Sequence, residues 1–151
     1  MKILIVEDDP IKLEALETFL GEPHSGLEIS KKLSYNSGLD AILSNEYDLL
    51  ILDMALQTYE PNNSERAGIS KIYGGKEIVM QMRLNGVSTP TLVITQFDTF
   101  GEEGNIKTLK ELDEELQMIA PSNYMGSIYF NIQSTSWHEE LSKILNSKGW
   151  L

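Results

Sequence analysis

Residues 3–9 read Ile3-Leu4-Ile5-Val6-Glu7-Asp8-Asp9, a short apolar run that ends in three acidic residues. A second run, Leu49-Leu50-Ile51-Leu52, is followed directly by Asp53. Strands whose side chains are all apolar are typical of a parallel sheet that is covered on both faces. Because the carboxyl ends of parallel strands meet at one edge, we expect the two acidic strand ends to form a hard-oxygen site for a divalent cation.

Apolar strands and amphipathic segments alternate along the chain, which predicts an α/β fold: a five-stranded parallel sheet, doubly wound, with helices on both faces. The predicted strands cover residues 2–6, 27–33, 47–53, 91–95 and 127–132. The predicted helices start at Pro10, at a cap on Asn36 or Ser37, at Gly74, near Ile106 and near Trp137. In the second helix, Leu39, Ile42 and Leu43 are expected to face the core.

Composition narrows the possible functions. The 151 residues carry 23 acidic and 12 basic side chains, a net charge of −11, which disfavours binding to nucleic acid or to an anionic membrane. With no cysteine, thiolate metal sites and thiol nucleophiles are excluded, and a reducing cytoplasm is expected. No apolar stretch approaches the length that spans a bilayer, so we expect a soluble cytoplasmic protein.

The chain is predicted to be a single domain over residues 1–151 with two insertions, at about 55–73 and 96–105. Both segments are rich in polar residues and glycine, and both follow a strand at its carboxyl end. Loops of this length in a compact domain are usually functional or disordered. We therefore expect both insertions to overhang the acidic site.

Four pieces of the chain resemble the receiver domain of response regulators in two-component signalling. They are residues 3–10, residues 47–54, the pair Gly74-Gly75 and residues 89–95. Receiver domains accept a phosphoryl group on an aspartate from a histidine kinase. The resemblance implies a flavodoxin-like sheet with strand order 2-1-3-4-5 and a site between strands 1 and 3.

The resemblance also implies a role for each site residue. Asp53 would be the phosphoacceptor that becomes 4-aspartylphosphate, and the Thr95 hydroxyl would bond the phosphoryl group. Mg²⁺ would be held by Glu7, Asp8, Asp53 and the backbone carbonyl of Ala55, with Asp9 assisting. Mg²⁺ offsets the repulsion between an attacking carboxylate and a phosphoryl group, and an aspartate that acts as a nucleophile forms an acyl phosphate.

The implied protein is a stand-alone response regulator in a phosphorelay. Its partners would be a sensor histidine kinase or a phosphotransfer protein, and a separate effector that it contacts through its surface. Nucleic acid and membranes are not expected as partners, and a homodimer is possible. It would not be an enzyme, beyond Mg²⁺-dependent self-phosphorylation from small donors and autodephosphorylation.

The chain departs from the family at the end of the fifth strand, where receivers carry a lysine. Here the aligned residue is Asn131 or, if the register slips, Gln133 or Ser134. Each can donate a hydrogen bond, but none supplies a cation to pair with Asp53 and the phosphoryl group. Losing this charge is expected to weaken phosphorylation or to uncouple it from conformational change.

Two further features bear on this departure. Gln96 follows Thr95 where the family prefers a small residue, so its amide would obstruct the site or contribute a donor. Arg66, Lys71 and Lys76, in or near the first insertion, are candidates to replace the lost lysine.

Two other functions remain as alternatives. One is a pseudo-receiver, a binding or scaffold module that keeps the fold but is not controlled by phosphorylation. The other is a Mg²⁺-dependent phosphohydrolase with an aspartate nucleophile, although the second acid usual two residues later is Ala55 here.

Overall fold

The computed structural model describes residues 1–21, 26–60 and 68–150. Its main sheet has five parallel strands in the order β2-β1-β3-β6-β9. They are β1 (Lys2–Val6), β2 (Glu28–Lys32), β3 (Leu49–Leu52), β6 (Thr91–Thr95) and β9 (Tyr124–Tyr129). The fold class is therefore as predicted, including the strand order 2-1-3-4-5.

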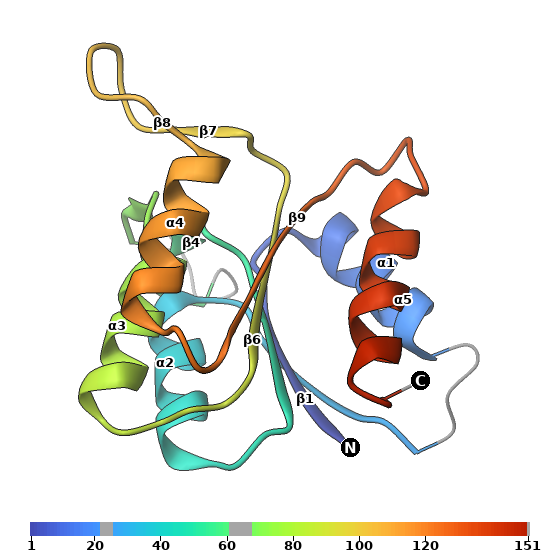
Figure 1. Ribbon diagram of the computed structural model, residues 1–151. Coiled ribbons are helices and arrows are strands. Elements are labelled where there is room, and N and C mark those ends of the chain that lie inside the picture. The colour runs from blue at the N-terminus through green and yellow to red at the C-terminus, as the bar shows by residue number, and fades with distance from the viewer. Residues whose placement is uncertain (22–25, 61–67, 151) are drawn as a thin grey trace.

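Helices cover both faces of this sheet, α2, α3 and α4 on one side and α1 and α5 on the other (Figure 1). They are α1 (Pro10–Gly21), α2 (Tyr35–Ser44), α3 (Gly74–Leu84), α4 (Leu109–Ile119) and α5 (Ser136–Ser147). In the part of the chain described, no helix has the length and apolar character needed to cross a membrane.

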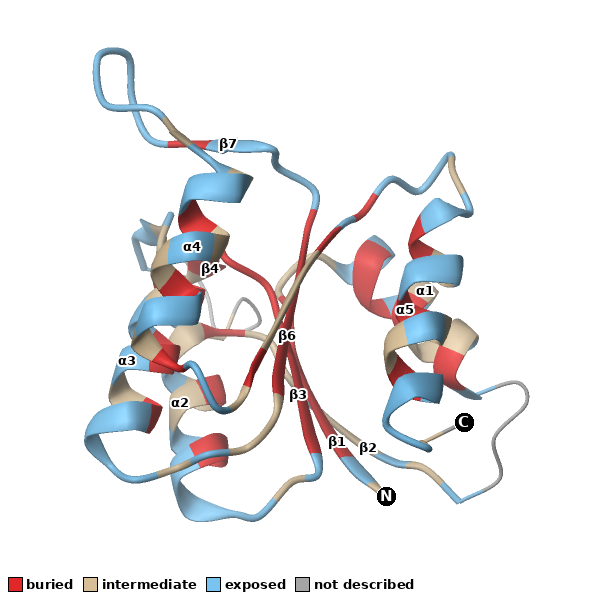
Figure 2. Cartoon of the chain, viewed as in Figure 1, coloured by how far each residue is buried: buried red, intermediate tan, exposed pale blue. Residues whose placement is uncertain are grey.

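Two hydrophobic cores lie between the sheet and its helix layers. Leu4, Val6, Leu50 and Leu52 face α2, α3 and α4, whereas the alternate residues of the same strands face α1 and α5. Figure 2 shows the buried residues concentrated along the central strands and the inner faces of the helices. Burial on both faces explains why β1 and β3 lack polar alternation, and it leaves the strand ends as the place for charged groups.

Three local predictions are wrong in detail. The cap of α2 is Ser34, whose side chain accepts a hydrogen bond from Ser37 N, and neither Asn36 nor Ser37 caps the helix. Leu43 lies on the exposed side of α2, so Ala41 rather than Leu43 joins Ile42 in the core. The fifth strand of the sheet is Tyr124–Tyr129 instead of 127–132, so Asn131 lies beyond its end.

The two long segments after β3 and β6 contain short strands of their own. β4 (Leu56–Gln57) pairs antiparallel with β5 (Ser70–Lys71), and β7 (Thr99–Phe100) pairs antiparallel with β8 (Lys107–Thr108). Figure 1 shows the β7–β8 hairpin projecting beyond the start of α4. The strict count of five strands thus holds for the main sheet only.

Candidate functional site

Three carboxylates meet at the carboxyl edge of the sheet. Glu7 and Asp8 follow β1, Asp53 follows the neighbouring strand β3, and the register pairs Val6 with Leu52 directly before them. One ligand oxygen from each of the three acids lies within 4.8 Å of the other two. Glu7 is only 1% exposed and Asp53 5% exposed, so two of the three acids are buried, and Asp8 is partly buried.

The Asp53 carboxylate is held from one side. Its backbone N–H donates to Val6 O over 3.0 Å, and its own Oδ1 accepts from Met54 N over 2.7 Å. Among the described residues, the hydrogen bond and the ion pair made with the carboxylate both fall on Oδ1. Oδ2 therefore keeps its lone pairs for a metal ion or an electrophile.

Asp8 and Asp9 have different environments. Asp8 Oδ2 accepts from Gln57 N over 2.9 Å, so the segment after β3 contacts the site, as expected for the first insertion. Asp9 Oδ1 accepts from Ile11 N over 2.9 Å, and its carbonyl accepts from Leu13 N, which together cap the start of α1. The Asp9 carboxylate is not part of the three-acid group.

A lysine that sequence reasoning missed completes the cluster. Lys12, in the first turn of α1, is 1% exposed, and its Nζ lies 2.5 Å from Glu7 Oε2 and 3.1 Å from Asp53 Oδ1. A signal was present in the sequence: Lys12 precedes Leu16 by four residues and Leu20 by eight, so it shares their buried helical face. A lysine on a buried apolar stripe requires an anionic partner.

Burial sets the proton affinity of the acids. Burial raises the pKa of the Glu7 carboxyl to about 8; the neighbouring Asp53 adds to this rise and the Lys12 ammonium opposes it. Burial also raises the pKa of Asp8, while the hydrogen bond from Gln57 N opposes that rise. A bound cation would therefore compete with protons for these carboxylate oxygens.

Thr95 ends β6 on the other side of Asp53 from β1. Its side chain is buried, and its Oγ1 accepts from Phe97 N over 3.2 Å. This bond uses an oxygen lone pair and leaves the hydroxyl proton free to be donated. Gln96 is exposed.

Lys71 and Lys76, the two described candidates after β3, are paired away from the acids. Lys71 Nζ lies 3.1 Å from Glu77 and stacks over the Tyr35 ring, and Lys76 Nζ lies 2.5 Å from Glu115. The idea that Lys71 or Lys76 replaces the lost lysine is therefore not supported by the geometry, and Arg66 lies outside the described residues.

The loop after β9 also lacks a cation directed at the acids. Asn131 is exposed, and its Oδ1 accepts from Gln133 N over 2.9 Å within the same loop. The side chain that resemblance places opposite the acceptor is thus engaged in shaping its own turn.

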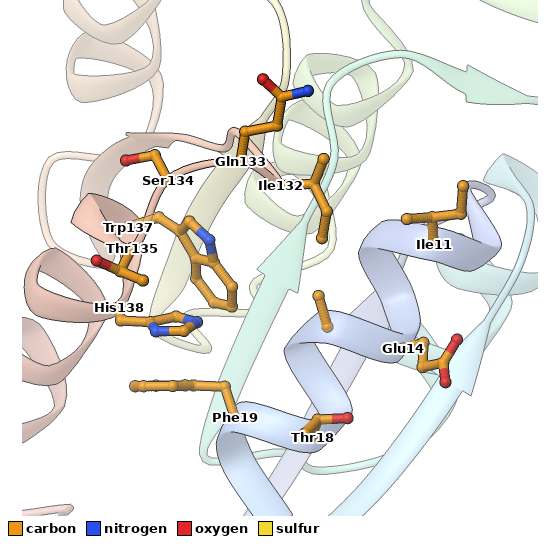
Figure 3. A pocket seen from close by; sticks show the side chains of 11 residues that line it. Ile11, Glu14, Thr18, Phe19, Ile132, Gln133, Ser134, Thr135, Trp137 and His138 are labelled. Carbon is orange, nitrogen blue, oxygen red and sulfur yellow. The ribbon is translucent and has the colours of Figure 1, made fainter.

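A groove of about 870 Å³ runs beside the site between α1 and the start of α5. Figure 3 shows Phe19 of α1 extending toward His138 at one end of the groove, and Ile11 and Ile132 at the other end. Ile11 and Ile132 are 63% and 58% exposed, so two apolar side chains flank the groove at the end nearest the acids. The groove offers a mixed apolar and polar surface next to the acidic edge.

Comparison with known proteins gives the family. The chain is 31% identical over 147 residues to the Detocs response regulatory protein DtcB of Enterobacter cloacae, covering 95% of this chain and 97% of that relative. It is 30% identical over 140 residues to the uncharacterized protein y4jR of Sinorhizobium fredii, covering 91% of each. No family model matches the chain.

Solved receiver structures share the fold. The Mg²⁺–BeF complex of response regulator TrrA from Thermotoga maritima superposes with a TM-score of 0.59 at 22% identity, over 95% of this chain and 98% of that one. The Mn²⁺-bound form of response regulator Rcp1 superposes with a TM-score of 0.65 at 15% identity, over 96% and 91%. The chain therefore belongs to the response regulators of two-component signalling and has the fold of their receiver domain.

Proposed function

We propose that this protein is a stand-alone receiver, a single domain with two insertions, that accepts a phosphoryl group on Asp53 from a histidine kinase or a phosphotransfer protein. One observation carries the proposal: the buried Asp53 carboxylate lies among two other acids, and its Oδ2 makes no hydrogen bond or ion pair with the described residues. The phosphorylated form would signal to a separate effector through its altered surface.

The residues present fit a divalent cation. Hard oxygens from Glu7, Asp8 and Asp53 converge, and burial together with the neighbouring Asp53 raises the pKa of Glu7, so added positive charge would favour its ionised form. These three carboxylates and the backbone carbonyl of Ala55 would hold Mg²⁺. Bound Mg²⁺ would neutralise negative charge shared by the acceptor and the phosphoryl oxygens.

The transfer step follows from the chemistry of the acceptor. A lone pair on Asp53 Oδ2 forms the new oxygen–phosphorus bond while the phosphorus–nitrogen bond of a phosphohistidine breaks, and the electron pair of that bond leaves with the imidazole, which takes up a proton. With acetyl phosphate the leaving group is acetate. The free Thr95 hydroxyl would then donate a hydrogen bond to a phosphoryl oxygen.

The phosphodonor would approach over the groove between α1 and α5. A phosphohistidine must reach the carboxyl edge of the sheet, and the exposed Ile11 and Ile132 provide an apolar contact surface beside that edge. The groove is therefore the surface that we assign to the kinase or phosphotransfer partner.

Incubation with Mg²⁺ and acetyl phosphate, followed by intact-mass measurement, tests the proposal. The wild type should gain one acid-labile phosphoryl group, Asp53→Asn should gain none, and omission of Mg²⁺ should prevent the gain. A wild type that binds Mg²⁺ but stays unmodified by acetyl phosphate and by a phosphorylated histidine kinase would leave the pseudo-receiver as the better description.

A further inference from the structure

The positive charge at the acceptor aspartate comes from the first helix. Lys12 Nζ contacts Glu7 Oε2 and Asp53 Oδ1 at 2.5 and 3.1 Å and thus bridges the acids at the ends of β1 and β3. We propose that Lys12 is the cation that pairs with Asp53 and then with its phosphoryl group, in place of a lysine at the end of the last strand of the sheet. This inference rests on the proposed phosphoacceptor function.

The burial of Lys12 argues against a packing role. The buried face of α1 consists of Lys12, Leu13, Leu16 and Leu20, and an apolar side chain at position 12 would continue this stripe. Removing an ammonium from water is costly, and apolar replacements of buried ion pairs are often neutral or stabilising. A lysine in this place therefore indicates a need for charge at the acids.

The contacts leave Lys12 able to bind an additional anion. Nζ touches both carboxylates as an ion pair but donates no hydrogen bond of regular geometry to any described residue. An ammonium has three N–H donors. Because Lys12 contacts Oδ1 and the phosphoryl group would add to Oδ2 of the same carboxylate, the new phosphoryl oxygens would lie next to these donors.

The other candidate cations in the described part of the chain point elsewhere. Lys71 and Lys76 pair with Glu77 and Glu115, and Asn131, which carries no charge, is exposed. Lys12 is thus the described basic residue whose ammonium contacts Asp53. Because Lys12 of α1 supplies this positive charge, the site does not need a lysine at position 131.

The test compares adduct formation in wild type, Lys12→Met, Lys12→Met/Asn131→Lys and Lys76→Met, with Mg²⁺ and acetyl phosphate. Lys12→Met should slow the gain of phosphoryl mass by roughly 100-fold, the loss typical when one preorganised donor is removed from a reacting centre. Asn131→Lys should recover a measurable part of that loss, because it adds a cation in the loop directly after β9. Lys76→Met, which removes a lysine paired with Glu115, should match wild type.

A second readout does not require transfer chemistry. Beryllofluoride with Mg²⁺ mimics the phosphoryl group, so it should raise the thermal stability of wild type and of Lys76→Met but raise that of Lys12→Met much less. A folded Lys12→Met that gains phosphate and responds to beryllofluoride as wild type does would overturn the inference and leave the proposed function intact. A wild type that responds to neither probe would instead refute the phosphoacceptor function.

If Lys12→Met does not fold, two variants that both lack the Glu7 carboxylate replace it. Glu7→Gln and Glu7→Gln/Lys12→Met differ only by the ammonium, and the double variant leaves fewer unpaired buried charges. The double variant should form the adduct at least about tenfold more slowly than Glu7→Gln alone, whereas equal rates would count against a role for Lys12.

Discussion

Lys12, Glu7 and Asp53 form a buried group in which one ammonium faces two carboxylates. The third acid, Asp8, is only partly buried and does not contact the ammonium within ion-pair distance. The Lys12 ammonium and a Mg²⁺ ion bound from solution would therefore both act on the carboxylates of Glu7 and Asp53. The stability of the protein and its affinity for Mg²⁺ are linked for this reason.

This linkage predicts the stability of Lys12→Met. Removing one partner of a buried ion pair costs roughly 3–5 kcal/mol, so the free energy of unfolding without Mg²⁺ should fall by about that amount. Mg²⁺ should recover part of the loss and should stabilise the variant more than wild type, because it restores positive charge between the acids. Urea unfolding with Mg²⁺ and with EDTA measures both effects, and equal Mg²⁺ stabilisation of the two proteins would contradict the prediction.

The raised pKa of Glu7 predicts that the free energy of unfolding depends on pH. Its pKa rises from 4.5 to about 8 on folding, so between these pH values the folded state holds a proton that the unfolded state has lost. This contribution to the free energy of unfolding is complete below the lower value and is lost as the pH rises through the upper one. Without metal, wild type should lose stability with rising pH relative to Glu7→Gln, and Mg²⁺ affinity should rise over the same interval.

Urea unfolding in EDTA at a series of pH values checks the first effect, and Mg²⁺ titration checks the second. Parallel stability curves for wild type and Glu7→Gln would show that Glu7 does not hold this proton.

At the scale of elements, two helices are anchored directly to the site. Asp9 caps α1 and so fixes the turn that carries Lys12. The start of α3 packs on the backbone that carries the acceptor, because Gly75 N donates to Met54 O over 2.9 Å. A Cβ added at Gly75 would lie 2.4 Å from Asp53 O, so only glycine allows this approach.

Gly75→Ala should therefore disturb both stability and site geometry. The clash is with backbone and cannot be relieved by a side-chain rotation, so a loss of about 1–3 kcal/mol in the free energy of unfolding is expected, together with slower adduct formation. Gly21→Ala is the matched control, since a Cβ there meets no atom within 4 Å. Equal thermal stability and equal adduct rates in the two variants would show that the α3 contact does not position Asp53.

At the scale of the whole molecule, the groove between α1 and α5 is lined by Ile11, three residues after Asp8, and by Ile132 (Figure 3). Because the acceptor is only 5% exposed, a protein donor must fit this surface more closely than a small molecule must. A substitution that weakens partner binding should therefore slow transfer from a protein donor but not from acetyl phosphate. A substitution of a reacting residue should slow transfer from both donors.

Ile11→Asp should slow phosphoryl transfer from a histidine kinase by about tenfold or more while leaving acetyl phosphate labelling near the wild-type rate, because a charge replaces an apolar contact in the groove. Met118→Asp, at a side chain that is 80% exposed on α4, is the control for the loss of an exposed apolar residue. Radiolabelled transfer assays compare the two, and an equal effect of both substitutions would remove the groove from the proposed interface.

Much of the fold follows from local patterns. The apolar runs at 3–6, 49–52 and 92–94 are buried on both faces, and Pro10 and Gly74 begin their helices as predicted. The α2 cap lies at Ser34 because several neighbouring polar residues have side chains that can cap a helix. The last strand lies at Tyr124–Tyr129 because residue type alone does not fix where a strand begins and ends.

The sequence by itself determined the alternation of strands and helices, and therefore the sheet that brings Glu7, Asp8 and Asp53 to one edge, because helix and strand periods and strand-end positions are local properties. Only the tertiary structure decided which cation reaches them. The pairing of Lys12 with Asp53 depends on how α1 packs across β1 and β3. Lys71 and Lys76 do not reach the acids because they form ion pairs with Glu77 and Glu115. Charges select partners by distance in space, which spacing along the chain does not specify.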